Sequence, residues 1–158
     1  MTVAPHSYRL GSGETVVYYF DPLDSAQGRR IDADLLSEAL STVHSEGQRR
    51  IKSTVDLGRR VGENRCVRTS EGDLIEYLKI GTRFGYGRFV KGRKPVPSTR
   101  VTVMLAWRQS FYVVLDAYVG PLAPPWPWDP RADPNSAEYW RSVEFWACHA
   151  LVLEDGHS

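Results

Sequence analysis

Short runs of β-branched and aromatic residues, separated by glycines and charged turns, dominate the middle of this chain. Residues of these types favour extended strands, and such runs joined by short turns favour antiparallel pairing. The runs interpreted as strands are Gly13–Phe20, Asn64–Thr69, Asp73–Ile80, Phe84–Val90, Arg100–Trp107 and Ser110–Val119. The step from Trp107 to Ser110 is short enough for a hairpin turn. Residues 64–119 therefore predict a β-meander.

Two other segments have helical patterns. Asp32 is a suitable N-cap for a helix over residues 32–46, whose apolar residues recur with the helical period and which Gly47 would end. A second helix over residues 135–150, capped by Asn135 or Ser136, is apolar on more than one side and should be well buried. The last apolar residues, LVLEDG, are also compatible with an edge strand.

The remaining long segments read as loops. Residues 48–65 are basic and punctuated by glycine, which indicates mostly loop with at most a short strand. The segment 121–134 contains six of the ten prolines and predicts an ordered strap, held to the sheet by Trp126 and Trp128.

These elements predict one α+β domain over residues 1–158, with an N-terminal and a C-terminal helix packed on a mostly antiparallel, twisted sheet. No apolar run approaches the roughly 18 residues of a membrane span, and the N-terminus lacks the pattern of a secretory signal. The two cysteines, Cys66 and Cys148, are too few for a disulfide framework or structural zinc and read as reduced thiols. We therefore expect a cytoplasmic protein without a membrane partner.

The net charge of +1 conceals an uneven distribution along the chain. Residues 1–48 carry three basic and seven acidic side chains (−4), residues 49–108 carry fifteen and five (+10), and residues 116–158 carry two and seven (−5). Positive charge concentrated in this way is typical of a surface that binds a polyanion. Two alternatives remain: a solvated basic sheet face covered by the acidic flanks, and a docking face for an acidic protein.

The strong catalytic signatures are absent. The sequence contains no phosphate-binding loop, no HExxH and no GxSxG motif, and no two histidines have the spacing of metal ligands. We therefore expect no cofactor and no metal. The residues that remain suit metal-free cleavage of RNA, which needs a base, an acid and a cation for the phosphorane.

His44 is the first candidate acid or base, because it falls at the predicted C-terminal end of a helix, where a cation is favoured. Arg49, Arg50 and Lys52 follow it and could clamp a phosphate, although a surface histidine beside a solvated basic loop explains the same residues. His149 is the second candidate, against the simpler interpretation of a core histidine.

Two strands carry further candidates. Alternation places Tyr86 and Arg88 on one face of their strand and Phe89 on the other, and an exposed aromatic beside a cation suits a stacked base and its phosphate. Arg93, in the following loop, is a candidate phosphate contact. The same alternation places Tyr112, Val114, Asp116 and Tyr118 on one face of the late strand, where Tyr118 could contact a phosphate or simply pack.

The order of a helix bearing His44, the segment Lys52-Ser-Thr54, a basic meander and the late strand VVLDAYVGP resembles the small RNase-toxin superfamily of barnase, EndoU, colicin-type and RelE-like domains. The resemblance covers roughly residues 34–120. It implies that His44 is the acid or base, that Lys52 or Arg88 clamps phosphate, and that Tyr118 is a contact at the strand end.

The resulting expectation is a metal-independent ribonuclease of bacterial toxin or toxin-derived type, which forms a 2′,3′-cyclic phosphate. His44, Tyr118 and His149 are its expected catalytic residues, and Arg49, Arg50, Lys52, Tyr86, Arg88 and Arg93 its expected RNA-binding residues. RNA is the expected partner, with an acidic antitoxin or immunity protein as a further one. The alternatives are a nucleic-acid-binding module without catalysis and an interaction protein that docks an acidic partner.

Overall fold

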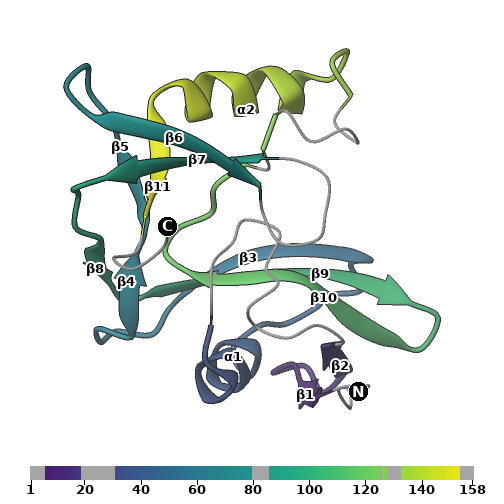
Figure 1. Cartoon of the computed structure of the whole chain (residues 1–158). Helices are drawn as coiled ribbons and strands as arrows, with labels where there is room; N and C mark the ends of the chain where they lie inside the picture. Colours follow the sequence, from purple (N-terminus) through teal and green to yellow (C-terminus); the bar gives the residue numbers. More distant parts are fainter. Residues whose placement is uncertain (1–5, 19–30, 80–85, 125, 128–132, 154–158) are drawn as a thin grey trace, which may run out of the picture. The chain divides into compact units, whose positions relative to one another are not determined.

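A computed structural model of the chain describes residues 6–18, 31–79, 86–124, 126–127 and 133–153. The protein is α+β, as the sequence predicts (Figure 1). The chain divides into two compact units, each assembled from two separate segments: unit 1 comprises Met1–Gly62 and Pro97–Leu122, and unit 2 comprises Glu63–Val96 and Ala123–Ser158. The sequence pattern predicts one domain. Because each unit is discontinuous and the basic stretch contributes to both, composition along the chain does not mark this division.

Unit 1 contains a five-stranded sheet in the order β1-β2-β10-β9-β3. Neighbouring strands are antiparallel except β2 and β10, which are parallel. The strands are β1 (His6–Arg9), β2 (Thr15–Tyr18), β3 (Arg50–Asp56), β9 (Arg100–Arg108) and β10 (Phe111–Val119). Two short strands, β4 (Gly62–Asn64) and β8 (Val96–Ser98), form a separate two-stranded ribbon.

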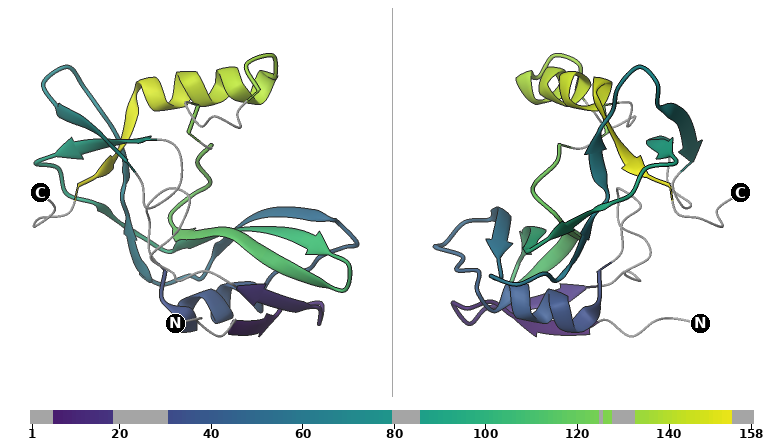
Figure 2. Two further views of the ribbon diagram at one scale, coloured as in Figure 1. Left: turned by 45° about the vertical axis from the view of Figure 1, so that its right-hand side comes forward. Right: turned by 90° about the vertical axis from the view of Figure 1, so that its left-hand side faces the viewer.

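Helix α1 (Ala33–Leu40) covers one face of this sheet, as the two views of Figure 2 show. Its N-cap is Asp32, as predicted: the carboxylate accepts a hydrogen bond from the Leu35 N–H at 3.3 Å. Leu36, Ala39 and Leu40 are buried against the strands. Together with the inward side chains of β2, β3, β9 and β10 they form the core of unit 1.

The helix ends at Leu40, well before the predicted end at Gly47. The Ser41 hydroxyl donates to the Glu38 carbonyl at 2.6 Å, and the Thr42 hydroxyl donates to the Ala39 carbonyl at 2.8 Å. These hydroxyls satisfy carbonyls that further helical turns would use, so the chain leaves the helix there. His44 consequently lies in a loop and not in the last turn of a helix.

Strand β3 occupies seven residues of the segment 48–65, where the sequence predicted mostly loop with at most a short strand. It pairs with β9 along its whole length, from Arg50 opposite Ala106 to Asp56 opposite Arg100. Ile51 is buried in the core and Val55 packs against it, while the alternate residues of β3 are exposed. The period-two pattern of a strand was therefore present, but the charged residues on the outer face concealed it.

A β-bulge at Leu115 changes which side chains of β10 share a face. The register pairs Val114 with Leu105 but Asp116 with Met104, so Leu115 is an extra residue. Tyr112 and Val114 face the core, whereas Asp116 and Tyr118 lie on the second face of the sheet, opposite α1. The prediction that all four residues share one face is therefore wrong, because it assumed unbroken alternation.

Unit 2 contains a four-stranded sheet in the order β5-β11-β7-β6, where β7 and β11 are parallel and the other neighbours antiparallel. Its elements are β5 (Cys66–Arg68), β6 (Leu74–Lys79), β7 (Tyr86–Lys91), helix α2 (Ala137–Ala147) and β11 (His149–Val152). Ser136 caps α2, which is one of the two caps that the sequence predicted. The helix ends at Ala147, and the strand that follows lies inside the sheet and not at its edge.

One face of the sheet of unit 2 packs against α2 and the proline-rich segment. Trp126 and Trp146 are buried, with ring centroids 3.9 Å apart, and the indole N–H of Trp146 donates to the Pro124 carbonyl at 3.0 Å. Phe89 and Leu151 pack into the same cluster. Trp126 therefore anchors this segment as predicted, and Trp128 lies outside the described residues. No helix in the described ranges is long and apolar enough to cross a membrane.

Candidate functional site

One end of the sheet of unit 1 brings together the β1–β2 turn, the β9–β10 turn and the start of β3. The register pairs Val16 of β2 with Tyr112 of β10, and Tyr112 with Trp107 of β9. The N–H of Trp107 donates to the carbonyl of Arg49 at 2.7 Å, immediately before β3 begins. We call this region the turn end of the sheet.

The turn end is strongly cationic. Its exposed basic side chains are Arg9, Arg49, Arg50, Lys52 and Arg108. Within the described part of the chain, none of the five forms an ion pair. The guanidinium of Arg9 donates to the Gly13 carbonyl at 3.2 Å, which draws it over the β1–β2 turn.

Two basic residues of unit 1 that lie away from the turn end form ion pairs. Arg59 forms an ion pair with Glu38 at 2.5 Å, and Arg100, at the opposite end of the sheet, lies 4.0 Å from Asp56. The Arg59 guanidinium lowers the pKa of Glu38, and the Gly58 N–H is the main cause of the lowered pKa of Asp56. The excess of positive charge in unit 1 is thus concentrated where the turns meet.

The β1–β2 turn packs directly on the loop that carries His44. The Gly11 N–H donates to the carbonyls of Leu40 and Val43, at 3.2 and 2.8 Å. A Cβ atom at Gly11 would lie 2.5 Å from the Ser41 carbonyl oxygen and 3.1 Å from Nε2 of His44. Only glycine allows this close approach, which places the imidazole against the turn.

Glu14 completes the contact between turn and loop. Its carboxylate accepts a hydrogen bond from the buried Ser45 hydroxyl, and the Ser45 N–H donates to the Ser12 hydroxyl at 3.0 Å. Hydrogen bonds from the hydroxyls of Ser12 and Ser45, in that order, lower the pKa of Glu14, and the charge of His44 lowers it further. Oε1 of Glu14 is buried and accepts no hydrogen bond from the described residues.

An aromatic pair adjoins this cluster. The rings of Trp107 and Tyr112 meet edge to face, with centroids 4.8 Å apart, and the Tyr112 hydroxyl donates to the Gln48 carbonyl. This bond fixes the end of the His44 loop to β10. Trp107 remains partly exposed beside Arg49.

The turn end of the sheet offers three chemical functions. His44 is an exposed imidazole that can accept or donate a proton. Glu14 is a carboxylate held in the ionised form and bonded to Ser45, the residue after His44. The surrounding guanidinium groups can stabilise negative charge on a phosphate. No three His, Cys, Asp or Glu side chains of the described ranges lie together as metal ligands.

Several of the predicted site residues lie in unit 1, in different positions. Arg49 and Arg50 are at the turn end with His44. Lys52 follows Arg50 on the second face, opposite Met104. Tyr118 is completely buried, so its ring offers no surface to a ligand in this structure.

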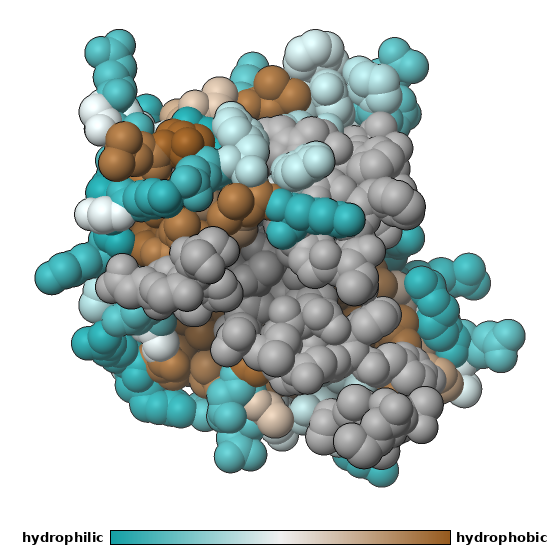
Figure 3. Space-filling view, viewed as in Figure 1, coloured by the Kyte–Doolittle hydropathy of each residue, from teal (hydrophilic) through white to brown (hydrophobic). Residues whose placement is uncertain are grey.

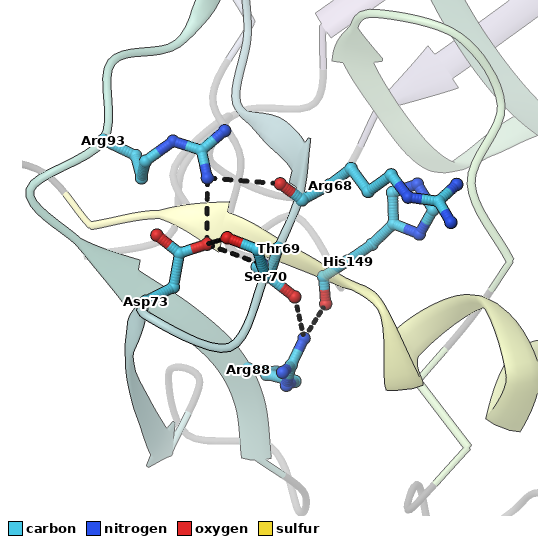
Figure 4. Close-up of polar contacts among 7 residues, drawn as sticks. All are labelled: Arg68, Thr69, Ser70, Asp73, Arg88, Arg93 and His149. Atoms are coloured by element: carbon cyan, nitrogen blue, oxygen red, sulfur yellow. Dashed lines mark hydrogen bonds and ion pairs between the residues drawn. The ribbon is translucent and has the colours of Figure 1, made fainter.

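Arg88 and Arg93 lie in unit 2, where both make structural contacts (Figure 4). The Arg88 guanidinium donates to the His149 carbonyl at 2.6 Å and to the Thr69 hydroxyl at 3.1 Å. Arg93 pairs with Asp73 at 2.9 Å and donates to the Arg68 carbonyl. These bonds join β5, β7 and β11, so much of the donor capacity of the two arginines is used within the fold.

The His149 side chain is partly buried on the face of the sheet that packs against α2. Its ring stacks on Phe145 of α2 with centroids 3.9 Å apart, and Nδ1 lies 2.9 Å from the Phe145 carbonyl. The Cys148 thiol lies 3.4 Å from the same nitrogen. Cys66 and Cys148 form no disulfide, and the register places Arg68 directly opposite His149.

Tyr86 is exposed on β7, and the predicted alternation of this strand is correct. The register pairs Tyr86 with Lys79 and Arg88 with Tyr77, while Phe89 packs into the α2 cluster on the other face.

Four residues of the turn end were not predicted as site residues from the sequence: Glu14, Ser45, Arg9 and Arg108. Glu14 and Ser45 are separated by thirty-one positions, and β1, which places the turn against the loop, was not predicted. The only available signal was the polar, glycine-rich turn Gly11-Ser12-Gly13-Glu14 before a strand.

Comparisons with known proteins establish the fold only. No protein-family model and no curated protein sequence matches the chain. A solved structure with a similar fold is the 2.35 Å crystal structure of a conserved hypothetical protein from Toxoplasma gondii ME49. The similarity has a TM-score of 0.51 at 9% identity and covers 88% of this chain and 94% of that chain.

Proposed function

We propose that this protein is a metal-independent ribonuclease whose reaction takes place at the turn end of unit 1. The observation that carries the proposal is that the turn with Glu14 packs on the loop with His44. Both lie at the end of the sheet where five exposed cations form no ion pair with the described residues. Phosphodiesters bind where unpaired guanidinium groups gather, and the cleavage of RNA requires a proton acceptor within reach of the ribose.

In this proposal His44 is the catalytic base and Glu14 a positioning residue. The imidazole takes the proton of the ribose 2′-hydroxyl, O2′ forms a bond to phosphorus, and the bond from phosphorus to O5′ breaks. The leaving O5′ takes a proton from solvent, and Arg49 and Arg50 stabilise the phosphorane charge. The products are a 2′,3′-cyclic phosphate and a 5′-hydroxyl, and no water is consumed in this step. Glu14 supports the imidazolium that forms.

The test uses an oligodeoxynucleotide with a single ribonucleotide, incubated with the protein in EDTA. The wild type should cut after the ribonucleotide and leave a cyclic phosphate, and an all-deoxy substrate should stay intact. His44→Ala should lose about 10²–10⁴ in rate, in the range of general acid–base catalysis. Added imidazole should restore part of that rate, because it replaces the missing base.

Glu14→Gln should lower kcat with little change in KM, because the positioning residue acts through His44 and does not touch the substrate. Glu46→Gln changes an exposed carboxylate two positions from His44 and is the matched control. An uncut ribonucleotide substrate with the wild type, or equal rates for wild type and His44→Ala, contradicts the proposal.

A nucleic-acid-binding module without cleavage is the second candidate. Arg50, Lys52 and Arg108 lie on the second face of the sheet, with Phe111 directly opposite Arg108. Cations beside a partly exposed aromatic ring favour binding of a nucleic acid even where no bond is cut. An oligonucleotide that is shifted on a gel but not cut supports this candidate.

A further inference from the structure

The sheet of unit 2 has α2 on one face only. Phe89 and Leu151 point toward α2, whereas Val90 and Val152 lie on the opposite face. Because side chains alternate along a strand, the same opposite face carries Tyr77 and Lys79 of β6 and Tyr86 and Arg88 of β7.

Two tyrosines on this face are exposed to solvent. Tyr77 is 58% exposed and Tyr86 is 55% exposed, although aromatic rings are usually buried for the apolar area that they remove from water. Tyr77 is paired with Arg88, and Tyr86 with Lys79, so the two rings are diagonal neighbours across β6 and β7. Side chains in such positions are about 7–8 Å apart, within reach of two successive unpaired bases.

The charge of this face favours an anionic ligand. Lys79 is exposed, and Arg88 is held beside Tyr77 by its bonds to Thr69 and His149. The described strands carry no carboxylate on this face: Glu76 points to the other face, where it pairs with Lys91 at 2.6 Å. Figure 3 shows hydrophobic and strongly hydrophilic side chains interleaved over β6 and β7.

We propose that Tyr77 and Tyr86, with Lys79, form a platform that binds single-stranded RNA by stacking two bases. Exposed aromatics on a sheet offer flat faces to unpaired bases, and a neighbouring cation holds the phosphate. The bases of a duplex are already stacked on one another, so the platform selects unpaired strands. The inference rests on the proposed ribonuclease activity. It specifies the substrate class of that activity as single-stranded RNA.

The test measures the affinity of the full chain for a fluorescein-labelled 2′-O-methyl oligouridine, which has no 2′-hydroxyl and is not cut. Tyr77→Ala with Tyr86→Ala should weaken binding by at least about fivefold per tyrosine. Tyr77→Phe with Tyr86→Phe keeps the stacking faces and should bind as the wild type does. A duplex made from the same strand and its complement should bind more weakly than the single strand and equally to all variants.

Leu74→Ala with Leu78→Ala is the matched control, because both leucines are exposed on the other face of the same strand. Lys79→Gln tests the platform without removing a ring. It should make the slope of log affinity against log salt concentration shallower by about 0.7, the value for one neutralised phosphate of a single strand. If the tyrosine-to-alanine variant binds the oligouridine as tightly as the wild type does, the inference is overturned. A platform that binds a protein and not RNA would give this result. Because the probe is not cut, failure of the platform is measured separately from failure of the ribonuclease.

Discussion

At the residue scale, Gly11 decides whether the turn end can form. Its N–H binds two carbonyls of the His44 loop, and its lack of a Cβ atom lets the Ser41 carbonyl approach. Through this contact the β1–β2 turn, which carries Glu14, lies against the loop that carries His44. The glycine therefore acts on the proposed site without touching any substrate.

We expect Gly11→Ala to lower the free energy of unfolding by about 1–3 kcal/mol, because the new methyl group overpacks against a backbone oxygen that cannot move alone. Chemical denaturation measures the change. Gly72→Ala is the control, since a Cβ atom at Gly72 meets nothing within 4 Å. Equal stability of the two variants would show that the turn and the loop separate freely.

The residues of the site were only partly predictable. His44, Arg49 and Arg50 could be identified because a histidine followed by cations is visible along the chain. Glu14 could not, because its proposed role depends on a hydrogen bond with Ser45, thirty-one positions away. Tyr118 was assigned to a ligand because local alternation carries no information about burial by distant segments.

At the element scale, the contacts of Arg88 hold three strands of unit 2 together. Its guanidinium on β7 reaches the backbone of β11 and the residue after β5. A charged donor to a buried carbonyl stabilises a fold more than a neutral one does. Arg88, which the sequence predicted to bind phosphate, thus has a structural role within unit 2.

We expect Arg88→Met to lower the free energy of unfolding by about 1.5–3 kcal/mol, because the His149 carbonyl and the Thr69 hydroxyl lose a charged donor. Thermal denaturation followed by circular dichroism provides the measurement. Lys94→Met removes an exposed cation that has no ion pair among the described residues and should leave stability nearly unchanged. Similar melting temperatures for the two variants would contradict the structural role of Arg88.

Elements with regular patterns were predictable, and those shaped by exceptions were not. The caps of both helices and the strands β5, β6, β7, β9 and β10 were visible in the sequence, whereas the short strand β8 was not. The early end of α1 depends on two hydroxyls that bond backward, and the faces of β10 depend on one extra residue at Leu115. Neither the early helix end nor the bulge alters the hydrophobic periodicity from which helices and strands are predicted.

At the scale of the whole molecule, carboxylates in both units are held in their ionised form. The pKa values of Glu14, Glu38, Asp56 and Asp73 are all lowered, from ordinary values of 4.5 for Glu and 3.8 for Asp. For Asp73 the main cause is the Ser70 N–H, followed by Arg93. The unfolded chain therefore binds protons more readily than the folded protein in this range.

We expect stability to be full above about pH 5 and to fall as the pH drops below about 4, through the lowered pKa values of these groups. Denaturant titrations across this range measure the change. Asp73→Asn cannot take up the proton, so its stability should fall less steeply with decreasing pH than that of the wild type. A steeper or unchanged slope would contradict the role of the Asp73 contacts.

The central claim is that phosphodiesters bind at the turn end of unit 1, and amide chemical shifts measured by NMR test it most directly. A 2′-O-methyl oligouridine is titrated into the isotopically labelled protein, and the shifts are mapped onto the sequence. The account predicts the largest changes in unit 1 at residues 12–14, 44–50 and 108–111, with little change around Asp56 and Arg100. Shifts absent from the first three segments, or largest at Asp56 and Arg100, would contradict it.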